Sequence, residues 1–127
     1  MASELRVNTL KDASGNNSVA MSNVAEGTAK AWVNINLTTP AIVDSHNIAS
    51  LTDGGTGKGE PQYTNNFSNG NYSVVVSTGT SGDVIASELA AQATVDSSKH
   101  RIAGRAMSDE TLTDYDIGCS QCCGDLA

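Results

Sequence analysis

The stretch AKAWVNINL, residues 29–37, carries the clearest secondary-structure pattern of the chain. Its side chains alternate between two kinds, and this period of two is typical of a strand with one buried face. The face expected to be buried carries Ala29, Ala31, Val33 and Ile35. The opposite face carries Lys30, Trp32, Asn34 and Asn36. The stretch therefore predicts a strand that lies with one side against a hydrophobic core.

Further strands are expected on both sides of this stretch. ELRVNTL (residues 4–10) alternates, with Leu5 and Val7 on one side, and YSVVVST (72–78) has apolar residues on both faces, as in a strand that is covered twice. The other candidates are residues 41–51, 62–67, 99–107 and 114–123. DVIASELAAQA (83–93) fits either a short helix or an irregular strand and loop. We therefore expect an all-β fold, a mainly antiparallel, sandwich-like module, with one short helix near 83–93 as an open alternative.

Length and charge limit the classes of protein to which this chain can belong. The chain has 127 residues, and we expect one β-rich module over residues 19–127, preceded by an N-terminal strand or attachment segment over residues 1–18. A net charge of −7 and seven scattered basic residues argue against binding to nucleic acid or to an anionic membrane surface. No apolar run approaches the roughly 18–20 residues of a transmembrane helix. The start MASELRVN lacks the apolar core of a signal peptide, so we expect a chain that is made in the cytosol and not secreted.

Residues 53–60, DGGTGKGE, resemble a phosphate-binding loop in composition only. A Walker loop that ended at Gly57 and Lys58 would need glycine at position 52 and serine or threonine at position 59, where the chain has threonine and glycine. The glycines instead predict the tip of a hairpin between strands near 46–52 and 62–67. Because Pro61 follows, we expect an irregular, projecting loop. Its candidates for docking or receptor contact are Gly57, Lys58, Gly59 and Glu60.

The cysteines and histidines do not match a metal-binding or catalytic motif. Cys119 and Cys122 form a C-x-x-C pair next to Cys123, but His46 and His100 lack the local pairing of zinc fingers. Packing, a disulfide and a metal site therefore stay open for the cysteines, in that order of preference. No serine lies in G-x-S-x-G. We expect no enzyme and no cofactor.

Acidic residues give little support for catalysis or for calcium binding. Glu88, Asp96 and Glu110 are candidates for the paired carboxylates of a glycan-degrading enzyme, but nothing in the sequence pairs them. DETLTDYD (109–116) lacks the spacing of an EF-hand, and we expect a solvated turn there.

The order of these segments resembles a family of small modules in the tail-fibre proteins of tailed bacteriophages, including phages of cyanobacteria. The segments that carry the resemblance are SELRVNTLKDASGNNS (3–18), GTAKAWVNINL (27–37), DSHNIASLTDGGTGKGE (44–60) and NYSVVVSTGT (71–80). DYDIGCSQCCGD (114–125) is similar to the last strand of the module. The chain departs from the family at His46, where an aromatic residue is usual, at residues 58–62, which look longer than usual, and at Cys122 and Cys123, which replace larger apolar residues.

The resemblance implies a structural virion protein: a short, homotrimeric tail fibre or fibre tip that contributes to host attachment. The alternatives are a trimeric capsid decoration or cement protein and, as a minor one, a glycan-degrading tailspike-type enzyme. The partners expected are copies of the chain, other proteins of the tail, baseplate or capsid, and a host surface glycan, with the protein located in the virion after synthesis in the host cytoplasm.

Strands with bulk on both faces would gain a second covered face if three copies pack around an axis. Trp32 stands on the polar side of its strand, which suggests either sugar stacking or, as a lone large aromatic, burial between subunits. The candidates for the trimer interface are Leu5, Val7, Trp32, Val33 and Val75.

Overall fold

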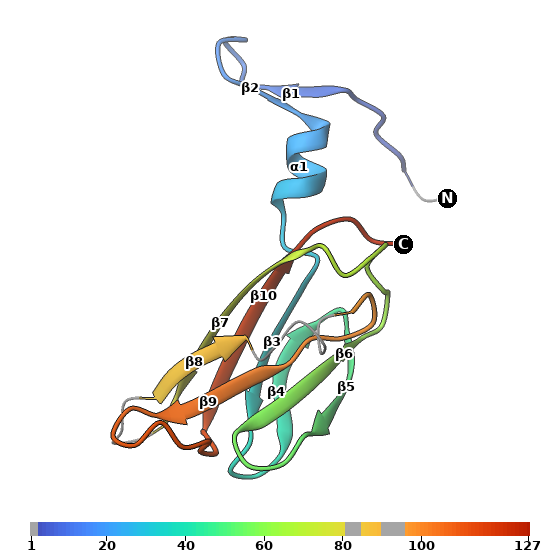
Figure 1. Cartoon of the computed structure of the whole chain (residues 1–127). Coiled ribbons are helices and arrows are strands. Elements are labelled where there is room, and N and C mark those ends of the chain that lie inside the picture. Colours follow the sequence, from blue (N-terminus) through green and yellow to red (C-terminus); the bar gives the residue numbers. More distant parts are fainter. Residues whose placement is uncertain (1–2, 81–84, 90–95) are drawn as a thin grey trace.

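The protein consists of an antiparallel β-sandwich with an N-terminal arm (Figure 1). The computed structural model describes residues 3–80, 85–89 and 96–127. The elements are β1 (Thr9–Lys11), β2 (Ser18–Ala20), α1 (Met21–Gly27), β3 (Ala31–Asn36), β4 (Ala41–His46), β5 (Ile48–Asp53), β6 (Lys58–Tyr63), β7 (Ser73–Gly79), β8 (Ile85–Leu89), β9 (Ile102–Ala106) and β10 (Ile117–Cys123). The strand pairs found among the described residues are antiparallel, so the prediction of a mainly antiparallel β fold is confirmed.

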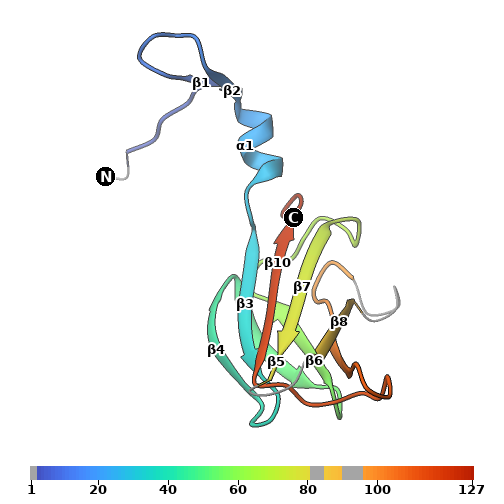
Figure 2. The ribbon, with the colours of Figure 1, turned by 90° about the vertical axis from the view of Figure 1, so that its left-hand side faces the viewer.

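Two four-stranded sheets make up the sandwich, one with the order β4-β3-β10-β7 and the other with the order β5-β6-β9-β8. Their inner faces pack against each other (Figure 2). One core cluster consists of Val33, Ile35, Leu37, Ile102 and Tyr115. A second consists of Ala31, Tyr63, Phe67 and Cys122. Both clusters draw residues from both sheets or their connections, and burial of this apolar surface is what holds the two layers together.

Strand β3 follows the sequence pattern closely. Ala31, Val33 and Ile35 are at most 2 % exposed and face the second sheet, whereas Trp32 is 39 % exposed and faces outward. β10 pairs with β3 on one side and with β7 on the other, so β3 and β10 are the two central strands of their sheet.

The structure corrects the prediction for β7. Val74 and Val76 are half-buried against the second sheet, but Val75 is 69 % exposed on the outer side. Within one chain the strand is therefore covered on one face only, because no further layer of the described chain lies over the outer side of this sheet.

Of the two alternatives left open for residues 83–93, a short helix or a strand and loop, the structure gives a strand over residues 85–89, which form β8. The other residues of that segment lie outside the described residues. β8 pairs with β9 over five register positions from Ile85 to Leu89, and this ladder of backbone hydrogen bonds outweighs a weak local helical period. The helix that the structure does contain, α1, was not predicted from the sequence. Its last turn is closed by Thr28, whose backbone N–H and hydroxyl both donate to the carbonyl oxygen of Val24.

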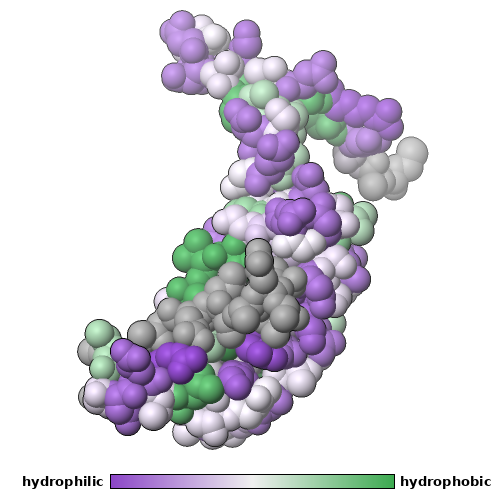
Figure 3. All heavy atoms as spheres, viewed as in Figure 1, coloured by the Kyte–Doolittle hydropathy of each residue, from purple (hydrophilic) through white to green (hydrophobic). Residues whose placement is uncertain are grey.

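Residues 3–28 form the arm, which extends away from the sandwich (Figures 1 and 2). The strand predicted over residues 4–10 is confirmed only at its end, where Thr9–Lys11 pairs with Ser18–Ala20. Residues 3–7 pair with no strand of the described chain. The turn of this hairpin is held by Asp12, whose carboxylate accepts hydrogen bonds from the Ser14 hydroxyl and the Asn16 backbone N–H. No residue of the arm is buried, and apolar side chains are exposed on it among hydrophilic ones (Figure 3).

Candidate functional site

The outer side of the sheet β4-β3-β10-β7 carries the most distinctive surface of the described chain. Six outward side chains from β3, β10 and β7 form what we call the open face: Trp32, Asn34, Cys119, Gln121, Val75 and Ser77. The strand register aligns them in two rows. The first row is Trp32–Gln121–Val75, and the second is Asn34–Cys119–Ser77.

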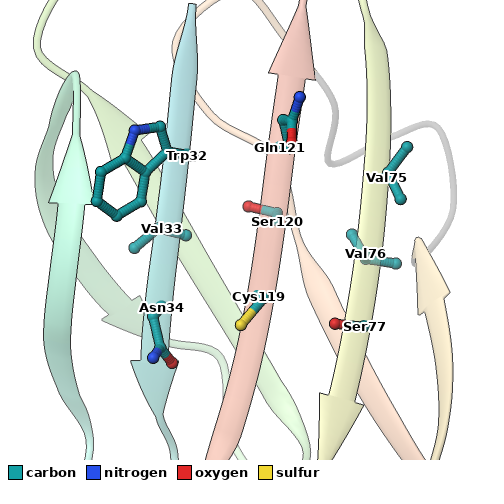
Figure 4. Close-up of a pocket in the computed structure, with 9 residues that line it drawn as sticks. All are labelled: Trp32, Val33, Asn34, Val75, Val76, Ser77, Cys119, Ser120 and Gln121. Atoms are coloured by element: carbon teal, nitrogen blue, oxygen red, sulfur yellow. The ribbon is translucent and has the colours of Figure 1, made fainter. Parts of the chain in front are cut away.

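The open face is shallow and hollowed. Trp32 and Val75 stand on either side of Gln121, and a groove of about 380 Å³ runs over the three strands (Figure 4). None of the six side chains carries a formal charge. The nearest ionisable groups by register are Asp44 and His46 on the neighbouring strand β4, opposite Asn34 and Trp32. The surface is therefore an uncharged strip with an acidic and an imidazole group along one border.

Asn34 introduces an unpaired acceptor into this strip. Its side-chain oxygen Oδ1 is buried, and it has no hydrogen-bond partner among the residues that the structure describes. A buried acceptor without a donor costs about 1–3 kcal/mol, so the single chain would gain stability if the Asn34 side chain turned to meet a donor.

The structure separates the residues expected at a trimer interface. Trp32 and Val75 lie in one row of the open face. Val33 does not belong with them, because it points into the core and is only 2 % exposed, which is the result of alternation along β3. Leu5 and Val7 lie on the arm, 79 % and 37 % exposed.

The arm carries its own apolar residues. Leu10 and Val19 lie directly opposite each other in the hairpin, 42 % and 37 % exposed, so their side chains share one side of it. On α1, Met21 and Val24 are half-buried and three positions apart, which places them on one side of the helix. These residues form an apolar stripe along the arm that the described chain does not cover.

The arm meets the sandwich at a polar joint. The backbone N–H of Lys30 donates to the carbonyl oxygen of Cys122 at 2.8 Å, which continues the β3–β10 ladder by one bond. A hollow of about 220 Å³ lies between Glu26 of α1 and the sandwich residues Asn71 and Asp125. The arm is therefore linked to the sandwich by backbone and polar groups and not by a shared apolar core.

The glycine-rich stretch is a hairpin tip, as predicted, but it does not project as an irregular loop. The turn closes at Gly54–Gly57, where the N–H of Gly54 donates to the carbonyl of Lys58 and the N–H of Lys58 to that of Gly55. Gly55 and Gly57 have φ angles of 89° and 69°, a region that favours glycine. The expected loop residues Lys58, Gly59 and Glu60 belong to β6 instead.

Close packing explains this difference. A Cβ atom on Gly57 would lie 2.7 Å from the backbone nitrogen of Thr113, and one on Gly59 would lie 2.6 Å from Cδ1 of Ile35. The N–H of Gly57 also donates to the carboxylate of Asp114 at 2.7 Å. Three of the four residues proposed for receptor contact, Gly57, Gly59 and Glu60, are thus buried, and Lys58 is half-buried.

Glu60 lies in an ion cluster on the outer side of the second sheet. Its carboxylate accepts from Lys99 Nζ at 3.0 Å and from the guanidinium of Arg101, whose Nε lies 2.8 Å from Oε1. The hydrogen bonds from Arg101 hold the pKa of Glu60 below its usual range, against the opposing effect of burial. The outer sides of the two sheets therefore differ, since one carries paired charges and the other is the uncharged open face.

His100 is the centre of a buried polar cluster that the sequence did not reveal. Its Nδ1 lies 2.7 Å from the hydroxyl of Tyr63, and its Nε2 lies 2.8 Å from the hydroxyl of Ser120. The side chain is 0 % exposed, and burial lowers the pKa of the imidazole to about 4. A serine, a histidine and a tyrosine joined by hydrogen bonds resemble a nucleophilic arrangement, but the imidazole is fully buried, so the cluster acts as a core network. Its partners lie far apart in sequence, so no local motif could have predicted it.

The three cysteines have different surroundings, and all three are free thiols. Cys122 is 0 % exposed in the core, where its Sγ lies 3.4 Å from the hydroxyl of Tyr63. Burial raises the pKa of this thiol to about 11. Packing, the first alternative from the sequence, is therefore confirmed for Cys122, whereas Cys119 and Cys123 are half-buried.

The acidic candidates take structural roles where the structure describes them. Asp96 accepts hydrogen bonds from the backbone N–H groups of Ser98 and Lys99 and so stabilises a turn. Glu110 lies in the turn predicted for residues 109–116, with a φ of 59°. The side chain of Glu88 lies outside the described residues.

Comparisons with protein-family models, with curated proteins and with solved structures found no match to this chain. Over residues 3–80, 85–89 and 96–127, no helix is long and apolar enough to cross a membrane. Within the same ranges, His, Cys, Asp and Glu side chains do not gather in any group of three that could hold a metal ion.

Proposed function

We propose that this chain is a structural protein of a tailed-phage virion: a short, homotrimeric tail fibre or fibre tip that contributes to attachment to the host. The observation that carries the proposal is the arm, residues 3–28, which is ordered into a hairpin and a helix without a single buried residue. A chain that presents such a segment is suited to assembly with other chains.

Simple energetics show why the arm needs partners. Its hairpin has two strands of three residues each, and an isolated two-stranded hairpin is at best marginally stable in water. Its helix has seven residues, whereas isolated helices shorter than about 12–15 residues are marginal. The apolar stripe of Leu10, Val19, Met21 and Val24 supplies the surface that a partner would bury.

The division of the molecule supports the same proposal. The arm would dock onto other virion proteins and onto the arms of sister copies, while the sandwich stands away from the attachment point (Figure 2). Three sandwiches held together would present three copies of each surface loop, so weak contacts with a host surface glycan would add by avidity. The resemblance of the sequence segments, in their order along the chain, to tail-fibre modules of phages supports this class of assembly.

A capsid decoration protein is the alternative, since an arm of this kind could equally anchor a sandwich on the head. Quantitative mass spectrometry of purified virions that carry this gene distinguishes the two by copy number. A few dozen copies or fewer, with density on the tail in an electron cryomicroscopy map, are expected for a fibre. Hundreds of copies on the head would favour the decoration protein, and absence from washed virions would refute both.

The arm itself is tested by deletion. A variant without residues 3–28 should retain the β-rich circular dichroism spectrum of the sandwich but fail to incorporate into virions. A matched control replaces the exposed Thr52 of β5, far from the arm in the sequence, with alanine and should incorporate normally. Incorporation of the truncated chain at the normal copy number would contradict the proposed role of the arm.

A further inference from the structure

The geometry points to the open face as the surface by which copies of this chain join, with the copies arranged around an axis that runs along β3. This inference rests on the proposed function, because both require a protein that assembles with its own copies. It adds the surface at which the copies touch. The occupant of the groove over Trp32, Gln121 and Val75 is thus a second copy of the same chain.

Charge is the first reason for assigning a second copy. The chain carries a net charge of −7, so two copies repel each other over most of their surfaces. None of the six side chains of the open face is charged, although 17 % of all residues are. The outer side of the other sheet carries Glu60, Lys99 and Arg101. Copies can therefore meet at the open face without bringing like charges of that face together, whereas a basic partner would be drawn to the acidic surfaces elsewhere.

Exposed apolar side chains are the second reason. Trp32 is 39 % exposed and Val75 is 69 % exposed, at the two ends of one row. Ile117 is 53 % exposed and, by alternation along β10, faces outward on the same side as Cys119 and Gln121. Tryptophan, here at one end of a row of neutral side chains, is among the residue types that most often dominate the binding energy of an interface.

The polar groups of the open face complement one another. Asn34 presents a buried, unpaired acceptor, and the same face carries two donor groups, the indole N–H of Trp32 and the side-chain amide of Gln121. If the Asn34 side chain turns outward at the interface, a donor from a neighbouring copy can satisfy its oxygen.

The arm fixes the direction of the axis. α1 lies beyond the N-terminal end of β3 and runs in nearly the same direction as that strand (Figure 2). Copies that meet at the open face around an axis along β3 would therefore bring their arms side by side. A single interface would then cover both the open face and the apolar stripe of the arm, which the described chain leaves exposed.

The experiment measures the mass of the full chain in solution by analytical ultracentrifugation for the wild type and two lysine variants. Val75→Lys puts a charge into the open face, and Ser50→Lys puts the same charge on exposed β5 of the other sheet. Both variants lower the net negative charge by one unit, so general repulsion changes equally. We expect three times the 13.0 kDa chain mass for the wild type and for S50K, and a single chain for V75K.

Cys119 provides a second measurement that does not depend on mass. With Cys123 replaced by serine, Cys119 should react slowly with a thiol reagent in the assembled protein and at least tenfold faster once V75K has separated the copies. Cys122, in the core, should stay unreactive in both and so reports that the variants are folded.

Each outcome decides the inference. A wild type that is a single chain, or a V75K variant that keeps the wild-type mass, overturns it. A dimer that V75K separates supports the open face but contradicts the homotrimer of the proposed function. Presence in the virion is measured independently by the composition of purified particles, so failure of the interface and failure of the virion role are told apart.

Discussion

The buried imidazole of His100 predicts a specific loss of stability in acid. Burial lowers its pKa from 6.5 to about 4 in the folded chain. Above pH 6.5 the imidazole is neutral in both the folded and the unfolded chain, so it makes no pH-dependent contribution. Below that value the unfolded chain binds a proton that the folded chain does not bind, and the free energy of unfolding therefore falls. The loss is largest at and below the folded pKa.

The two pKa values set the size of the effect. Linkage between them gives a loss of about 2 kcal/mol at pH 5 and about 3 kcal/mol at pH 4, relative to neutral pH. Such a loss is a sizeable part of the roughly 5–15 kcal/mol that stabilises a small domain. In the neutral imidazole one nitrogen accepts a hydrogen bond and the other donates one, to the hydroxyls of Tyr63 and Ser120. Protonation turns both nitrogens into donors and so removes the hydrogen bond that the imidazole accepts.

The assay is urea unfolding followed by circular dichroism at pH 7, 6, 5 and 4, at one protein concentration because the proposed assembly would also stabilise the folded chain. His100→Gln should be less stable at pH 7 but should lose about 3 kcal/mol less than the wild type on going to pH 4. Glu60, whose pKa is lowered by its hydrogen bonds with Arg101, also loses stabilisation in acid, but it does so equally in both proteins. His46→Gln, at an exposed position of β4, is the matched control and should keep the wild-type slope. Parallel pH curves for the wild type and H100Q would refute the argument.

Two further predictions follow from the packing. Gly57→Ala should destabilise the fold by about 3 kcal/mol, because the new Cβ atom would combine a left-handed backbone with contacts below 3 Å to Thr113 and Gly104. Gly55→Ala, which has open space at its Cβ, should cost about 1 kcal/mol. Equal losses of the two variants in urea unfolding would show that the steric contact is not real. A thiol reagent should label at most two cysteines per folded chain and all three in denaturant, because Cys122 is buried and its thiol has a raised pKa. Labelling of three thiols without denaturant would contradict the core position of Cys122.

Local alternation was sufficient to predict most strands and the buried side of β3. It identified Ala31, Val33 and Ile35 as one face, and the structure places that face in the core. It left helix and strand open for residues 83–93, where pairing with β9 decides the conformation of Ile85–Leu89. It failed for residues 4–7, which alternate but have no partner strand in the described chain. Pairing between distant segments depends on the whole fold, so the hydrophobic pattern within one segment cannot predict it.

The candidate site was predictable only in part, for the same reason. The sequence named Trp32 and Val75 as candidates for a trimer interface, but it could not separate them from Val33. It also could not place Gln121 between them, because the row Trp32–Gln121–Val75 is created by the register of β10 with its two neighbours. The loop proposed at Gly57–Glu60 failed because close contacts with Thr113 and Ile35, distant in sequence, hold the backbone in a tight hairpin.

The valine run of β7 is an argument for the proposed assembly that needs both the sequence and the fold. Val74 and Val76 pack inside the sandwich, so Val75 must point outward by alternation. A polar residue at this position would suit a solvated surface, whereas full burial of valine is worth about 1.5–3 kcal/mol. Within one chain each sheet is covered on one face only, but β7 carries apolar side chains on both of its faces. A further copy over the open face would cover Val75, Trp32 and Ile117 together, and the charge of −7 limits where on the molecule such a copy can come close.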